Sequence, residues 1–171
     1  MINTIKESLW TQFGGSIDML KNAITLWPDE HWHTDKTFFY IAYHSVVFLD
    51  YYLTTPAKTF SSPLSFSITK YEDAPREAVD DVIPNKIYSK HEMLQYLEAC
   101  RQKCHALINN LTEEQLSARW IEKDGNMNYS VLEILLYNMR HIQHHTGQLN
   151  MLLRQKINDA PLWVARAKDA L

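Results

Sequence analysis

The sequence contains little glycine and little cysteine. It has four glycines and two cysteines among its 171 residues. So few glycines, together with long stretches free of helix breakers, favour helices over a protein built from many short strands and tight turns. Cys100 and Cys104 lie four residues apart within an expected helix, which is not the disulfide framework of a small secreted domain. We therefore expect an all-α protein.

Excess positive charge and long apolar runs are also missing. Seventeen Lys and Arg against 20 Asp and Glu give a formal net charge of −3, so no nucleic-acid partner is expected. No apolar run approaches the roughly 20 residues of a membrane span, and the first residues lack the pattern of a signal peptide. We expect a cytoplasmic protein that does not bind membranes. A hydrophobic content of 46% is sufficient for the core of a single domain spanning residues 1–171.

Four long helices are predicted from apolar residues that recur every three or four positions and from capping signals. They are expected at residues 4–26, about 34–53, 89–110 and 130–156. Gly14 and Gly15 in the first helix indicate either a tolerated weak spot or close packing of another helix. Gly147 in the fourth indicates close approach of a neighbouring helix or subunit. A short terminal helix containing Trp163 is expected after Asn158.

Residues 54–88 interrupt the helical pattern with four of the six prolines. A connection this long inside a compact domain is usually functional or covers part of the domain. Residues 64–68 alternate between apolar and polar side chains and suggest an isolated extended segment, for which the sequence offers no partner strand. Asp124 and Gly125 predict a small hairpin-like connection between residues 120–121 and 127–129. Together, these features predict an up-down-up-down four-helix bundle with a long connection between its second and third helices.

Three histidines lie where these helices can bring them together. Residues four apart share one face of a helix, so His141 and His145 can aim both imidazoles at one point. Neutral imidazole is a favoured ligand of transition metals, and open catalytic zinc sites often use three protein ligands. His44 lies in the middle of the second helix, which is apolar almost all round and should be buried. It is a candidate third ligand, and the alternative is a core histidine satisfied by a hydrogen bond.

Other polar side chains near these positions have less certain roles. His144 is rotated about 100° from His145 around the helix, so it is interpreted as an outer-sphere or surface residue. Asp50 lies off the face of His44 and is interpreted as an outer-sphere carboxylate or a surface residue. Cys100 and Cys104 share a helical face and have the spacing to bind metal, but reduced cysteine more often packs as a small core residue.

The aromatic second helix with His44, and the segment His141-x-x-His144-His145-x-Gly147-Gln148-Leu149, resemble the DinB/YfiT-like family of metalloenzymes. The family pattern is His-x-x-x-His-x-Gly-Gln, and Thr146 stands where arginine is common. The resemblance implies that His44, His141 and His145 bind a divalent transition metal, zinc or nickel in the first place. Water or substrate would fill the remaining positions. It also implies a homodimer, which is common in the family.

The same resemblance implies a reaction, because the family includes bacillithiol and mycothiol S-transferases. We expect transfer of a low-molecular-weight thiol to an electrophilic small molecule, since a metal can bind a thiol as its nucleophilic thiolate. One alternative is hydrolysis by metal-activated water. No obvious general base lies near the three histidines, which favours transfer. The other alternative is a non-catalytic protein in which the metal or the histidine cluster only holds helices together.

Overall fold

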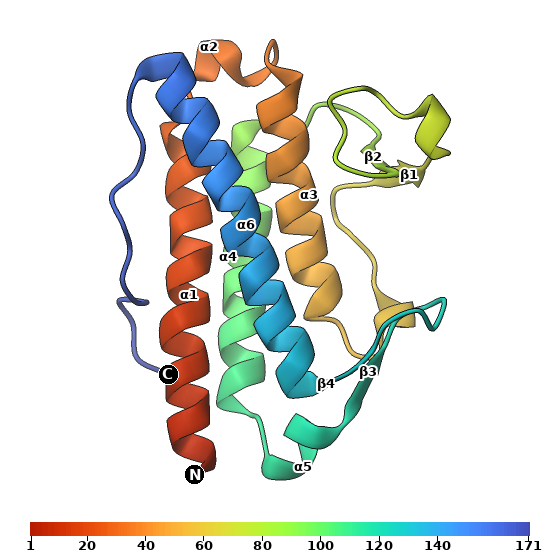
Figure 1. Ribbon diagram of the computed structural model, residues 1–171, viewed down its shortest axis with the longest axis vertical. Helices are drawn as coiled ribbons and strands as arrows, with labels where there is room; N and C mark the ends of the chain where they lie inside the picture. The colour runs from red at the N-terminus through yellow and green to blue at the C-terminus, as the bar shows by residue number, and fades with distance from the viewer.

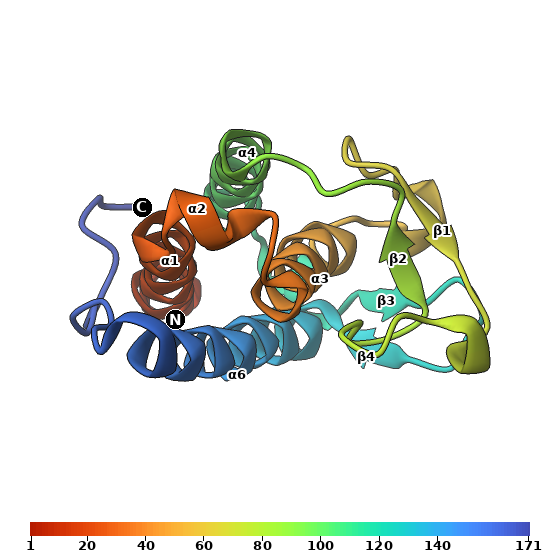
Figure 2. The same ribbon diagram turned by 90° about the horizontal axis from the view of Figure 1, so that it is seen from above.

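The computed structural model describes residues 1–171, and most of the chain is helical (Figure 1). The long helices are α1 (Ile2–Leu26), α3 (Lys36–Tyr52), α4 (Lys90–Asn109) and α6 (Val131–Ile157). α1 and α3 each pack against both α4 and α6, so the four helices surround a common core when seen from above (Figure 2). The short helices are α2 (Asp29–Trp32), α5 (Glu113–Ser117), η1 (Ala57–Thr59) and η2 (Tyr71–Asp73). None of the helices has the length and apolar character that a membrane crossing requires.

The long helices run up, down, down and up, so the alternating directions expected from the sequence are wrong (Figure 1). α3 and α4 are parallel: Tyr43 of α3 stacks on Tyr88 just before α4, and Asp50, further along α3, binds Lys103, further along α4. The physical reason is the connection over residues 54–88, which returns the chain to the end where α3 began. A short turn would have forced an antiparallel neighbour, whereas a long connection permits a parallel one.

The helical core is built mainly from aromatic and aliphatic side chains. α3 is buried on several sides, as its nearly uniform apolar character predicts, because it packs against α2, α4, α6 and β2. Its side chains Phe38, Phe39, Val46 and Leu49 have no exposed surface. The core therefore fixes α3, and with it the position of His44, from several directions.

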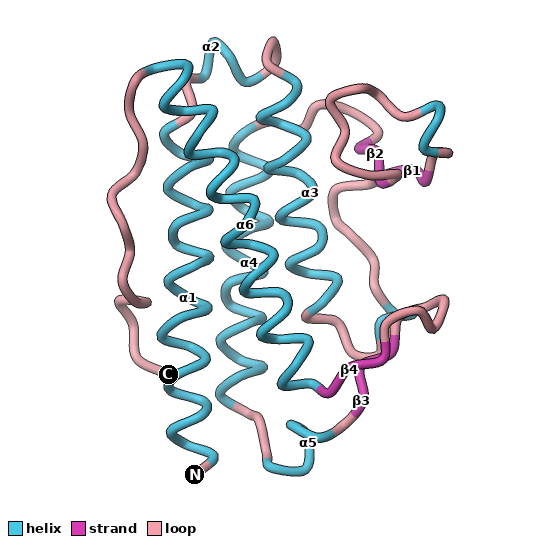
Figure 3. Tube along the Cα trace, viewed as in Figure 1, coloured by secondary structure: helices cyan, strands magenta, loops and turns pink.

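Two small antiparallel sheets stand beside α3 (Figures 2 and 3). β1 (Phe66–Ile68) pairs with β2 (Val82–Pro84), and β3 (Arg119–Ile121) pairs with β4 (Asn128–Ser130). The hairpin-like connection predicted between residues 120 and 129 is confirmed. The view of residues 64–68 as an unpaired extended segment was wrong, because β2 is only three residues long and ends in a proline, which gives no strand signal in the sequence.

The C-terminal residues 158–171 form an extended tail along α1 instead of the expected short helix (Figure 3). Ala167 donates its backbone N–H to the carbonyl oxygen of Thr11 over 2.9 Å. A Cβ at Gly14 would lie 2.8 Å from the Cβ of Ala167, and one at Gly15 would lie 3.2 Å from tail backbone. The glycine pair therefore does allow close packing, but the partner is the tail and not a helix.

Replacing Gly14 by alanine should destabilise the protein, because the added methyl group overlaps the tail. Overpacking of this kind costs about 1–3 kcal/mol, which exceeds the gain of up to about 1 kcal/mol from removing a glycine within a helix. Gly147→Ala is the matched control, since no atom lies within 4 Å of a Cβ there, and it should stabilise. The close approach expected at Gly147 is thus absent within this chain. Urea denaturation gives the free energy of unfolding of the two variants. A change of the same sign in both would contradict the interpretation.

Candidate metal centre

His44 from α3 and the histidines at 141 and 145 from α6 converge on one point between the two helices. Nε2 of His141 lies 2.9 Å from Nε2 of His44 and 3.1 Å from Nε2 of His145. The spacing of four residues on α6 supplies two of the rings, and the adjacent α3 supplies the third. His44 and His145 are buried, and His141 is partly buried. The structure therefore brings together the three histidines that the sequence singled out.

The contacts of Nδ1 in His145 and in His44 indicate which ring nitrogens carry hydrogen. These Nδ1 atoms are the outer nitrogens of the cluster, on the side of each ring away from the converging Nε2 atoms. Nδ1 of His145 lies 2.7 Å from Oε1 of Gln148, and Nδ1 of His44 lies 3.0 Å from Oδ2 of Asp80. The amide oxygen of Gln148 only accepts hydrogen bonds, so in neutral His145 Nδ1 holds the hydrogen and Nε2 holds a lone pair. The negative carboxylate beside Nδ1 of His44 favours the same tautomer in that ring. Both lone pairs face Nε2 of His141, which can offer at most one hydrogen. Such a convergence of lone pairs fits a cation.

The distances and protonation states also fit a divalent metal ion. An ion about 2.0–2.1 Å from two nitrogens holds them about 2.9 Å apart at a right angle and about 3.3 Å apart at the tetrahedral angle. Burial, reinforced by the neighbouring histidines, lowers the pKa of His141 to about 3. Burial and His44 likewise lower the pKa of His145 to about 4. Both rings are therefore neutral near pH 7, the form that binds metal.

Two residues around the cluster were not assigned a role from the sequence. Gln148 belongs to the histidine motif of the sequence, and the structure shows that it orients His145 from about one turn further along α6. Asp80 was missed, because it belongs to the irregular connection, where no periodicity relates it to His44. Its carboxylate is the nearest candidate for a general base. However, it contacts Nδ1 of His44, on the side of the ring away from the converging Nε2 atoms.

His144 lies outside the convergence. It is exposed on the neighbouring face of α6, with its ring edge-on to that of His145 and the centroids 5.0 Å apart. Cys100 and Cys104 are buried in α4, and burial raises the pKa of both thiols. They are therefore protonated core residues, as the simpler interpretation predicted.

Asp50 is neither an outer-sphere carboxylate nor a surface residue, the two roles that its position in the sequence suggested. It is 8% exposed, and its carboxylate accepts hydrogen bonds from Tyr96 and Lys103 of α4. Neither interpretation took into account that α4 covers this face of α3. Asp50 thus links two parallel helices and is separate from the histidine cluster.

A cavity of about 450 Å³ lies on the side of α3 that faces the long connection, and none of the three histidines lines it. Phe48 lines this cavity, and its ring centroid lies 4.5 Å from that of His44. Phe48 and Tyr51 of α3 form one wall, Phe60 and Phe66 of the connection form another, and residues 122–124 of the β3–β4 turn complete it. The two irregular parts of the chain therefore create a partly open cavity with aromatic and charged walls, which Phe48 separates from His44.

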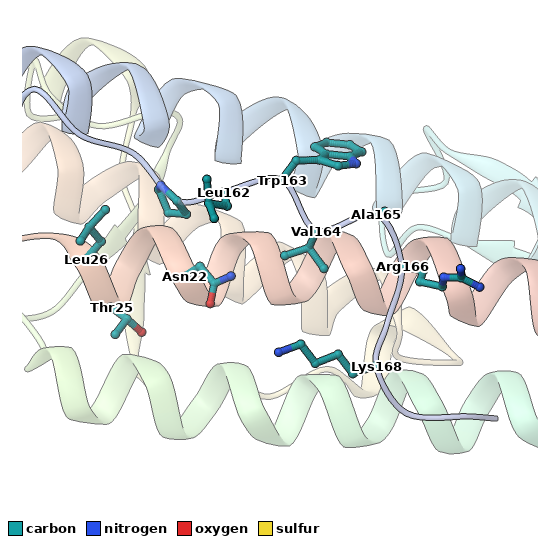
Figure 4. Close-up of a pocket in the computed structure, with 10 residues that line it drawn as sticks. Asn22, Thr25, Leu26, Leu162, Trp163, Val164, Ala165, Arg166 and Lys168 are labelled. Atoms are coloured by element: carbon teal, nitrogen blue, oxygen red, sulfur yellow. The ribbon is translucent and has the colours of Figure 1, made fainter.

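Two further cavities differ in their relation to the cluster. One, of about 670 Å³, lies between α1 and the C-terminal tail (Figure 4) and includes none of the histidines. A smaller one of about 300 Å³ is lined by Tyr137, Arg140, His141 and His144 on α6. Because His141 lines this smaller cavity, the cluster is accessible from the α6 side.

A mostly helical protein with three convergent histidines between two of its helices fits the class of metal-binding proteins. The chain belongs to the DinB superfamily, whose family model matches residues 12–149. The match includes the three histidines, Gln148 and the whole connection between α3 and α4. Among curated proteins, none matches this chain.

Proposed function

We propose that this chain is a metal-dependent enzyme that transfers a low-molecular-weight thiol to an electrophilic small molecule. The observation that carries the proposal is that three protein nitrogens, and not four ligands, converge, and that one of these histidines, His141, lines a cavity. Structural zinc sites are normally closed by four protein ligands, often including cysteine, whereas catalytic sites keep a position open. Both cysteines of this chain are buried in α4, so neither serves as a fourth ligand.

The proposed roles follow from the residues around the cluster, within a single four-helix bundle domain. His44, His141 and His145 would hold the ion, with zinc or nickel as the proposed metals. A bound divalent ion supplies a site that favours thiolate over thiol at neutral pH. Gln148 fixes the orientation of His145. Phe48, Tyr51 and Phe60 offer apolar surface that excludes water and receives the electrophile.

Metal content and thiol transfer test the proposal together. Protein purified without a histidine tag is stripped with a chelator and reloaded with zinc or nickel, and the bound metal is counted. Thioether formation from monochlorobimane is then followed with bacillithiol, glutathione and cysteine. In this reaction the sulfur bonds to the chloromethyl carbon, chloride leaves with the bonding electrons, and the thiol proton passes to solvent.

We expect one metal ion per chain and a metal-dependent acceleration with at least one thiol. Failure to bind stoichiometric metal under every supply would rule out the metal centre. Stoichiometric metal without acceleration by any thiol would reject thiol transfer, and metal-dependent cleavage of an ester substrate in the same preparation would support hydrolysis instead. Metal binding with neither activity would support the non-catalytic role.

A further inference from the structure

We propose that Asp80 is a positioning residue that holds the metal ligand His44 through its Nδ1, so that metal binding and the folding of residues 66–84 stabilise each other. The proposal rests on the metal-binding function proposed above. It also assigns a role to the long connection, which carries Asp80 and forms part of the wall of the neighbouring cavity.

The contact between Asp80 and His44 is close, and its histidine end is buried. Oδ2 of Asp80 lies 3.0 Å from Nδ1 of His44, and this nitrogen is buried without a hydrogen-bond partner of good geometry. The carboxylate thus lies within ion-pair distance of the N–H without being aligned with it. When a cation binds at Nε2, the ring N–H becomes a stronger donor, and a carboxylate beside it makes the ligand more basic and fixes the ring.

The other two rings are held differently. Nδ1 of His145 is bound by Gln148 from the same helix, so α6 alone sets that geometry. Nδ1 of His141 is buried and has no partner. Among the three histidines, only His44 has its outer nitrogen in contact with a segment distant in the chain. The orientation of His44 therefore depends on how the connection folds.

The connection also fixes the carboxylate itself. Oδ1 of Asp80 accepts a hydrogen bond from the backbone N–H of Val82 over 3.0 Å, which leaves Oδ2 for His44. Val82 begins β2, which pairs with β1 and packs against α3. Beyond the strands, the N–H of Thr69 donates to the carbonyl oxygen of Asp81 over 2.9 Å. The two oxygens of Asp80 thus join the small sheet to the histidine cluster.

This arrangement implies reciprocal coupling between the metal and the connection. If Asp80 favours the metal-binding orientation of His44, then bound metal must favour the conformation of residues 66–84 that presents Asp80, by the same factor. Phe66 and Val82 of this segment also line the cavity of about 450 Å³. Metal binding should therefore help to hold one wall of the proposed substrate site in place.

The experiment compares Asp80→Ala and Asp80→Asn with wild type, and uses Asp81→Asn as a matched control. Asp81 is the adjacent carboxylate and lines the cavity, whereas the carboxylate paired with His44 is that of Asp80. Zinc affinity is measured by competition with a chromophoric chelator, and the visible spectrum of the cobalt-loaded protein reports the ligand geometry. Hydrogen exchange of residues 66–84 is recorded with and without metal.

We expect Asp80→Ala to weaken zinc binding about 10–100-fold, as is typical for loss of an outer partner of a metal ligand, and to alter the cobalt spectrum. Asp80→Asn should lose less, because its amide oxygen can still accept from Val82 or face His44. Asp81→Asn should bind zinc like wild type. Metal should slow exchange in residues 66–84 of wild type and should not do so in Asp80→Ala.

Several outcomes would overturn the inference. Wild-type zinc affinity and exchange behaviour in Asp80→Ala would do so, and so would an equal loss of affinity in Asp81→Asn, which would indicate a general charge effect. If Asp80→Ala does not fold, Asp80→Asn decides alone, since it keeps an acceptor for Val82. A wild-type protein that binds no metal would instead contradict the proposed function, so the two failures are distinguishable.

Discussion

His141→Ala should abolish stoichiometric metal binding, whereas His144→Ala, on the neighbouring face of the same helix, should leave it intact. This is the expected result because Nε2 of His141 is the atom that both other Nε2 atoms approach, at 2.9 and 3.1 Å. Its removal leaves two nitrogens that no longer surround one point. The loss of affinity should exceed the roughly 10–100-fold effect of removing an outer partner.

Thermal unfolding with and without zinc measures this difference. A ligand at 100 times its Kd stabilises the folded state by about 2.7 kcal/mol, which corresponds to roughly 5–10 °C in Tm for a chain of this size. Wild type and His144→Ala should show the full shift, and His141→Ala should show none. Retention of one zinc per chain by His141→Ala, or loss of zinc by His144→Ala, would show that the ligands are assigned wrongly.

Asp50→Ala should be among the most destabilising single changes in the helical core. Its carboxylate accepts from the hydroxyl of Tyr96 and from Nζ of Lys103, each over 2.6 Å. Tyr96 is itself buried, and its pKa is raised by burial, by Cys100 and by Asp50, so the hydroxyl keeps its proton and donates. Alanine leaves this hydroxyl without its acceptor and removes the carboxylate that pairs with the ammonium of Lys103, which keeps only its hydrogen bonds to Oγ1 of Thr54 and to the backbone oxygen of residue 50. We expect a loss of about 3 kcal/mol, the lower part of the range for a broken buried ion pair, because Lys103 is partly exposed.

The control for this prediction is Glu98→Ala, which removes a carboxylate from α4 that pairs with Lys21 at the surface. Exposed ion pairs contribute about 0–1 kcal/mol. Urea denaturation at pH 7, with the slope compared between variants, gives the two free energies of unfolding. If Asp50→Ala costs no more than Glu98→Ala, Asp50 does not link α3 to α4 in the way described.

The features that sequence could predict are local ones. Helix positions follow from side chains three and four residues apart, and the same geometry places His141 and His145 on one face. His44 became a candidate because a polar ring in a nearly apolar helix needs a partner. These inferences need only the regular repeat of one helix at a time, and the structure brings all three histidines together.

The features that sequence missed depend on contacts between distant segments. Asp80 reaches His44 from an irregular connection, and β1 and β2 are strands of three residues each, too short to show alternation. The parallel course of α4 was missed although the length of the connection permits it. The glycine pair at 14 and 15 indicated close packing, but nothing in the residues after Asn158 identified the tail as the partner.

The parallel course of α3 and α4 sets a minimum length for the chain between them. α3 has 17 residues and is about 25 Å long, a distance that about eight extended residues can cover. Most of residues 54–88 are therefore surplus to the return path. This surplus can change in length and sequence without altering how the long helices pair, so substrate preference can diverge there independently of the fold. Position 80 is constrained, because it must still reach His44, and so are Val82, which holds Asp80, and the buried side chains of Ala57 and Leu64.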